Sequence, residues 1–161
     1  MLISLFFTMI IVFFSYISFI WIKYGSQRSI SASYYILPKN INILFTLFCW
    51  GFALPAIIIG TTLTDSGLMF FAGTGIMFVG AAAAFREKLT NSVHMIGAYG
   101  GVLFSQLAIA INFKAYYVNV IFLMLVLFVQ FFGDKVNMKK IWWQEIFAFL
   151  SILYIYFISI F

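Results

Sequence analysis

Residues 43–62 read ILFTLFCWGFALPAIIIGTT, a run of apolar and small residues without a single charged side chain. A helix of about 20 apolar residues can cross the hydrocarbon core of a bilayer, where every backbone polar group must be paired within the helix. This run therefore predicts a membrane-spanning helix. Five further stretches of 18 to 21 residues have the same character and lie at residues 2–22, 68–85, 93–112, 116–133 and 141–161.

The composition of the whole chain agrees with this pattern. Of its 161 residues, 65% are hydrophobic and 8% are charged, whereas a soluble domain carries about 25% charged residues. No stretch alternates apolar and polar residues with the period of two that a transmembrane strand requires. We therefore predict an all-α integral membrane protein, in which residues 1–161 form a single domain of six transmembrane helices and no soluble catalytic domain is present.

Small residues indicate how these helices pack. In lipid, helices associate through small and polar side chains at helical spacing, and the second and fourth stretches carry such residues in steps of four and three, as in a left-handed bundle. Gly80 and the glycines at 97, 100 and 101 predict a tight hairpin between the third and fourth helices.

The basic residues predict the orientation. Eight of the nine Lys and Arg residues fall in the first, third and fifth connections, and only Lys114 falls in an even-numbered one. Short loops rich in Lys and Arg stay on the cytoplasmic side of a membrane. We therefore expect residues 23–40, 86–92 and 134–140 to be cytoplasmic, both termini to be extracytoplasmic, and the protein to lie in the inner (plasma) membrane.

Several function classes fail for lack of the necessary residues. The basic residues form no continuous surface for nucleic acid, and one Cys and one His cannot supply a zinc site or a bis-histidine haem. There is no phosphate-binding Walker loop. We expect no cofactor, no metal and no nucleic-acid partner.

Two ionisable residues lie inside the predicted helices, where such groups are costly and often functional. His94 and Glu145 both fall near the cytoplasmic boundary, where a pair could relay protons or orient a bound headgroup. Alternatively, His94 caps its helix or contacts phosphates, and Glu145 reaches nearby lysines. At a similar depth we expect a polar vestibule formed by His94, Glu145, Glu87, Asn42 and Thr46.

The first connection is the longest. Residues 25–40 read GSQRSISASYYILPKN, with hydroxyl groups between two basic side chains. Such a segment can lie in the membrane interface and hold an anionic phospholipid headgroup, or it can be an ordinary basic loop. The predicted headgroup-binding residues are Arg28, Ser29, Ser31 and Lys39.

Three short motifs carry a resemblance to known proteins. SISASYY at residues 29–35, FVGAAAAF at 78–85 and the His-x-x-Gly-Ala motif starting at His94 resemble small polytopic membrane proteins of bacteria and phages. That resemblance implies a multi-pass membrane protein and no particular activity. Ser31 and His94 also resemble two residues of the ceramidase and adiponectin-receptor-like hydrolases, but the further histidines of their zinc site are missing.

Three functions remain possible from the sequence. The first is a non-enzymatic protein that binds lipid or a protein partner, including a second copy of itself, through the vestibule and the 25–40 loop. The second is a small proton-linked transporter or channel. The third is an intramembrane hydrolase that uses Ser31 or Ser29 as nucleophile, His94 as base and Glu145 to orient the base.

Overall fold

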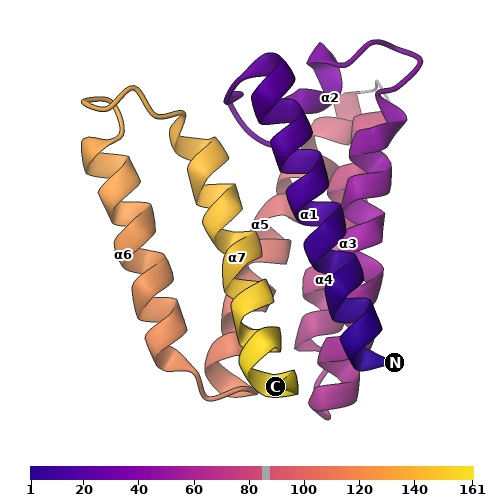
Figure 1. Ribbon diagram of the computed structural model, residues 1–161, viewed down its shortest axis with the longest axis vertical. Helices are drawn as coiled ribbons and strands as arrows, with labels where there is room; N and C mark the ends of the chain where they lie inside the picture. Colours follow the sequence, from indigo (N-terminus) through magenta and orange to yellow (C-terminus); the bar gives the residue numbers. More distant parts are fainter. Residues whose placement is uncertain (85–87) are drawn as a thin grey trace.

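The computed structural model describes the backbone of residues 1–84 and 88–161, and the side chains of all but residues 83–91. Seven helices and no strands occur in these described parts of the chain. Six helices are long and run side by side, as Figure 1 shows. Their bounds are α1 Leu2–Tyr24, α3 Ile43–Leu63, α4 Leu68–Ala84, α5 Lys88–Ile111, α6 Tyr116–Phe132 and α7 Lys140–Ile160, and a short α2 spans Ser33–Ile36.

These helices confirm the all-helical class, and each of the six apolar stretches falls largely within one long helix. Four helical segments of the described chain are long and apolar enough to cross a membrane, namely α1, α3, α7 and the Ser92–Ile111 part of α5. Helices α4 and α6 are apolar but have 17 residues each. The described part of α5 includes residues 88–92, which were expected to form a loop, and no Gly or Pro stands there to break the helix.

The predicted hairpin between α4 and α5 is present, and its backbones meet at Gly75 and Gly97. A Cβ atom on Gly75 would lie 2.7 Å from the carbonyl oxygen of Gly97, so no larger residue fits there. Gly80 does not take part, since it packs against Cys49 of α3, and Gly100 has only a side chain of its own helix within 4 Å. Of the glycines that the sequence singled out, Gly97 and Gly101 therefore take part in the hairpin contact, and their partner on α4 is Gly75 in place of Gly80.

Helices α6 and α7 form a second hairpin, which stands to one side of the other helices in Figure 1. Polar side chains bind it to α5, because Gln106 donates to the Ser151 hydroxyl at 2.8 Å and Asn119 donates to the Gln106 carbonyl at 2.9 Å. At the far end of α7, the Tyr156 hydroxyl donates to the Ala56 carbonyl of α3 at 2.6 Å. These bonds hold α7 between α5 and α3, where its side chains line one wall of a cavity.

Candidate functional site

The connection between α1 and α3 folds into the end of the bundle rather than over it. Figure 1 shows this 25–42 loop at the end opposite both termini. Its apolar side chains Ile30, Tyr34 and Leu37 are buried and belong to the hydrophobic core. Because they are spaced by four and three residues, they form one face of the helical turn that includes α2. The loop is therefore inserted by burial of this apolar face.

A buried hydroxyl network joins the loop to α1. The side chain of Ser33 is fully buried, and its hydroxyl donates to the Ile30 carbonyl at 2.5 Å. The Tyr16 hydroxyl of α1 then donates to Ser33 Oγ, also at 2.5 Å. Since a buried polar group is costly unless it is hydrogen-bonded, this network explains how a polar loop is accommodated in an apolar bundle.

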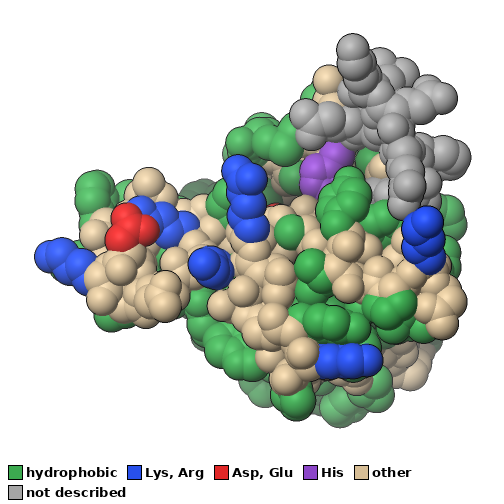
Figure 2. Space-filling view, turned by 90° about the horizontal axis from the view of Figure 1, so that it is seen from above, with side chains coloured by type: hydrophobic (Ala, Val, Ile, Leu, Met, Phe, Trp, Pro, Cys, Tyr) green, Lys and Arg blue, Asp and Glu red, His purple; other side chains and the backbone are tan. Residues whose placement is uncertain are grey.

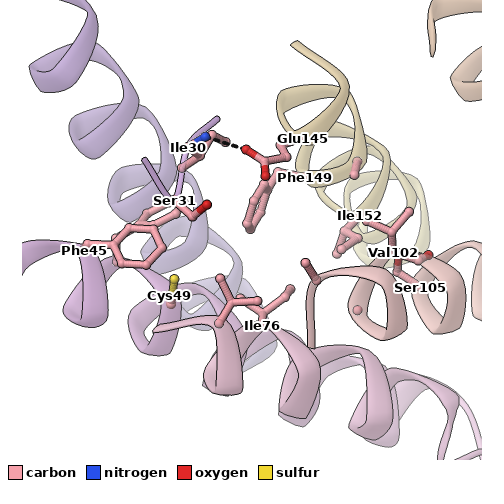
Figure 3. Close-up of a pocket in the computed structure, with 15 residues that line it drawn as sticks. Ile30, Ser31, Phe45, Cys49, Ile76, Val102, Ser105, Glu145, Phe149 and Ile152 are labelled. Atoms are coloured by element: carbon pink, nitrogen blue, oxygen red, sulfur yellow. Dashed lines mark hydrogen bonds between the residues drawn. The ribbon is translucent and has the colours of Figure 1, made fainter. Parts of the chain in front are cut away.

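Glu145 of α7 holds the loop from the opposite side. Its Oε2 atom accepts a hydrogen bond of 2.5 Å from the backbone N–H of Ile30, drawn as a dashed line in Figure 3. Among the residues whose side chains are described, Glu145 forms no salt bridge, and the ion pair found there joins Lys140 to Asp134. Its carboxylate therefore binds loop backbone and forms no ion pair with Lys139 or Lys140, while the side chain of Lys88, the third lysine of the alternative interpretation, lies outside the described residues.

His94 of α5 reaches the same loop one residue further on. Its Nε2 atom lies 3.2 Å from the hydroxyl of Ser31, and the Ser29 hydroxyl lies 3.0 Å from that of Ser31. Ser29 also accepts the backbone N–H of Ala32 at 3.0 Å, so its own proton is free for donation. The structure thus places His94 and Glu145 against neighbouring loop residues, with a serine beside the imidazole.

A cavity lies on the inner side of Ser31 and Glu145. Figure 3 shows it between α3, α4, α5 and α7, with the Ser31 hydroxyl and the Glu145 carboxylate at one end. Its volume is about 70 Å³, which holds a few water molecules or a small apolar group. Apart from Ser31, Glu145, Ser105 and Cys49, apolar side chains and Gly101 line it, including Phe45, Ile76, Ala98, Val102, Phe149 and Ile152.

The other predicted vestibule residues lie elsewhere. Thr46 donates to the Gly80 carbonyl at 3.0 Å and so joins α3 to α4. Asn42 stands at the start of α3, and its side chain makes no capping hydrogen bond there. Glu87 lies outside the described residues. Of the five vestibule residues, His94 and Glu145 are the two whose described side chains reach the loop.

The four predicted headgroup-binding residues are separated into two sets. Ser29 and Ser31 belong to the internal network, whereas Arg28 and Lys39 are exposed. Arg28 lines a second, open groove, which it shares with Lys139 and Lys140 at the start of α7. Figure 2 views this end of the molecule and shows Lys and Arg side chains spread around it. Lys39 does not line that groove.

Sequence reasoning missed the role of Tyr16 in this site. The residue lies in the middle of the first predicted helix, and its hydroxyl could have indicated a buried partner, because Tyr hydroxyls are usually hydrogen-bonded when buried. The spacing of Ile30, Tyr34 and Leu37 is the local signal for insertion of the loop. Each of these patterns involves only a few residues. The groups that hydrogen-bond to each other, such as Tyr16 with Ser33 and Ile30 with Glu145, are 17 to 115 residues apart in sequence.

Chemically, the site combines a hydroxyl beside an imidazole with an apolar cavity and a carboxylate. Within the described residues, no three His, Cys, Asp or Glu side chains are grouped so that they could hold a metal ion. Comparisons of the chain with protein-family models, with curated proteins and with solved structures found no match. The function is therefore argued from this geometry.

Proposed function

We propose that the 25–42 loop and the cavity beneath it bind an amphiphilic small molecule or the end of a lipid. The observation that carries this proposal is the cavity, which has apolar walls and convergent polar groups, Ser31 and Glu145, at one end. Ligand sites commonly combine an apolar pocket with a few placed polar groups. The polar part of the ligand would bind at Ser31 and its apolar part would lie against Phe45 and Ile152.

We further propose that all six long helices cross the inner membrane as a left-handed bundle with both termini outside. Helices α4 and α6 lie alongside the four longer spans in Figure 1, and the two termini are at the same end, as an even number of crossings requires. The loops at the opposite end include residues 23–40 and 134–140, which carry six of the nine basic residues. The positive-inside rule places that end in the cytoplasm.

The groove lined by Arg28, Lys139 and Lys140, here called the basic groove, supports a second contact, with the membrane surface. Arg28, Lys139 and Lys140 carry three positive charges, and Asp134 offsets one of them through its 2.6 Å ion pair with Lys140. Each basic residue near an anionic membrane surface contributes about 1 kcal/mol to binding. We propose that this groove takes the headgroup of an anionic phospholipid from the surrounding bilayer, with Lys39 not involved.

Photocrosslinking tests the binding proposal. The probe is a glycerol ether with a short diazirine-bearing alkyl chain, which has no ester to hydrolyse, and peptide mass spectrometry locates the crosslink. The test variant Ala98→Phe fills the cavity from α5, and Ala110→Phe adds the same bulk on α5 away from it.

We expect crosslinks on cavity-lining residues of the wild-type protein and of Ala110→Phe, and a loss of about tenfold or more in Ala98→Phe. Native mass spectrometry of the same samples reports whether a second copy or another protein is bound. Crosslinks scattered over the lipid-facing surface, unchanged in Ala98→Phe, would refute the proposed site.

A further inference from the structure

The contact between Ser31 and His94 has the geometry of a nucleophile and its base. The distance of 3.2 Å between Ser31 Oγ and His94 Nε2 is within the range that such pairs show before substrate binds. Ser29 Oγ already accepts the Ala32 N–H, so its hydroxyl proton can be donated to Ser31 Oγ at 3.0 Å. Ser31 then directs its own proton to His94.

The residues on both sides of Ser31 are fixed. Ile30 is held through its N–H by Glu145, and Ser33 is held by Tyr16 and by the Ile30 carbonyl. Three helices, α1, α5 and α7, therefore determine where the Ser31 hydroxyl lies. Catalytic groups need such support, because a displacement of about 1 Å can cost about 100-fold in rate.

The cavity gives this pair a place for one part of a substrate. A cavity of about 150 Å³ is known to hold benzene, so the volume of about 70 Å³ here corresponds to a group of roughly three or four carbon atoms. An acyl group of that size would lie among Phe45, Ile76 and Ile152, with its carbonyl carbon at Ser31. The Glu145 carboxylate on the same cavity disfavours an anionic group there.

We propose that Ser31 and His94 form a catalytic pair that cleaves neutral esters of short acyl groups, such as a butyryl ester. This inference rests on the proposed binding site. Ser31 Oγ attacks the ester carbonyl and its proton passes to His94 Nε2. When the C–O bond of the ester breaks, His94 returns that proton to the leaving alcohol, and Ser31 keeps the acyl group.

Water completes the reaction. His94 takes a proton from a water molecule that attacks the acyl-Ser31 carbonyl, the bond to Ser31 breaks, and the proton returns to Ser31 Oγ as the short carboxylic acid leaves. The Ser29 hydroxyl lies 3.0 Å from Ser31 Oγ and can donate a hydrogen bond to that oxygen as its bond to the acyl carbon breaks. Glu145 and Tyr16 act through the loop and are positioning residues.

Serine-directed labelling tests this proposal on the full-length protein in lipid nanodiscs. The probe is a short-chain alkyl fluorophosphonate, which forms a stable bond with an activated serine, and peptide mass spectrometry locates the adduct. The variants are Ser31→Ala and His94→Gln, and Ser26→Ala is the control because it removes a hydroxyl of the same loop outside the network. Gel filtration establishes that each variant is folded.

We expect an adduct on Ser31 of the wild-type protein and of Ser26→Ala, none in Ser31→Ala, and labelling about 100-fold or more slower in His94→Gln. The protein should also hydrolyse p-nitrophenyl butyrate at least about tenfold faster than p-nitrophenyl palmitate, because the longer chain does not fit. Absence of an adduct on Ser31 in the wild-type protein, or equal labelling of several serines, overturns the proposal.

The two proposals can fail separately. If the glycerol ether probe crosslinks to the cavity but Ser31 does not react, the site binds ligands without acyl transfer, and the catalytic proposal is wrong while the binding proposal stands. If the ether probe does not crosslink there and Ser31 still reacts, the pair is active and the ligand is not held in the cavity. That result contradicts the proposed binding mode and the selectivity for short chains.

Discussion

Two connections at the same end of the molecule differ in how they relate to the bundle. The 25–42 loop is inserted, and its backbone and hydroxyl groups are bound by α1, α5 and α7. The 133–139 connection between α6 and α7 is exposed along most of its length, and its Asp134 makes a surface ion pair. Both segments are polar and basic. The difference arises because only the first has apolar residues spaced to form a buried face.

This comparison shows that a basic loop in a membrane protein is not defined by its charge alone. In the inserted loop, the basic residues remain outside and the small hydroxyl residues point inward. Serine is suited to this position because one hydroxyl can accept and donate at once, as Ser33 does between Tyr16 and Ile30. The exposed connection makes no such buried hydroxyl contacts, and most of its side chains remain at the molecular surface.

The largest effect is expected from Ser33→Leu. This change removes two hydrogen bonds and adds bulk at a fully buried position, so the free energy of unfolding should fall by about 3 kcal/mol or more. Lys135→Leu, in the exposed connection, should change it by less than about 0.5 kcal/mol. Denaturant titration in mixed micelles measures both. Equal effects would mean that the two loops are equally exposed.

The second largest loss in the free energy of unfolding is expected at Glu145. Glu145→Ala leaves the Ile30 N–H without its partner, and we expect a loss of about 1 to 3 kcal/mol, whereas Glu145→Gln keeps a side-chain oxygen that can accept the same bond. Hydrogen exchange of peptides covering residues 25–42 and 133–139 is the measurement. Exchange should rise in the first peptide only, and only in the Ala variant. Identical exchange in Ala and Gln variants would show that the bond does not hold the loop.

A smaller effect is expected at the basic groove. Removing two charges in the double variant Arg28→Gln, Lys139→Gln should weaken retention of phosphatidylglycerol about tenfold or more, at about 1 kcal/mol for each charge. The double variant Lys39→Gln, Lys135→Gln removes the same charge elsewhere and should have less effect. Co-purified lipid is quantified by mass spectrometry. A similar loss in both double variants would show that net charge matters and the groove does not.

The smallest effect is expected from Asp134→Asn. It breaks the exposed ion pair with Lys140, in which the Asp134 side chain is 80% exposed. Exposed pairs contribute little, so the free energy of unfolding should fall by about 0.5 kcal/mol or less and the change should vanish at high salt. The same titration at low and high salt measures it. A loss comparable to that of Ser33→Leu would contradict the contrast between the loops.

The long helices were predictable from the sequence, because each is a continuous apolar run bounded by polar residues. The α4–α5 hairpin was predictable from its glycines, and Gly97 of α5 does make the contact, but its partner on α4 was not predicted. Gly75 meets Gly97 while Gly80 faces Cys49, because the rotation of a helix within the bundle depends on all of its neighbours and not on its own sequence.

The candidate site was predictable only in part. The cost of placing His94 and Glu145 within spans drew attention to both residues, and their common depth followed from the topology. The sequence around His94 and Glu145 does not predict their partners, Ser31 and Ile30. These partners are 63 and 115 residues away in the chain. Thr46 shows the limit of this reasoning, since at a similar depth it binds the backbone of α4.

Cysteine accessibility tests insertion of the 25–42 loop most directly. With the lone Cys49 replaced by Ala, single cysteines are placed at Ser33, Lys39 and Lys135, and a membrane-impermeant maleimide is applied from each side of the membrane in turn. We predict that the cysteines at 39 and 135 react from the same side and that the cysteine at 33 is protected until the protein is denatured. Equal reaction at 33 and 39 in the folded protein would contradict the inserted loop, and with it the cavity beneath the loop on which both proposals depend.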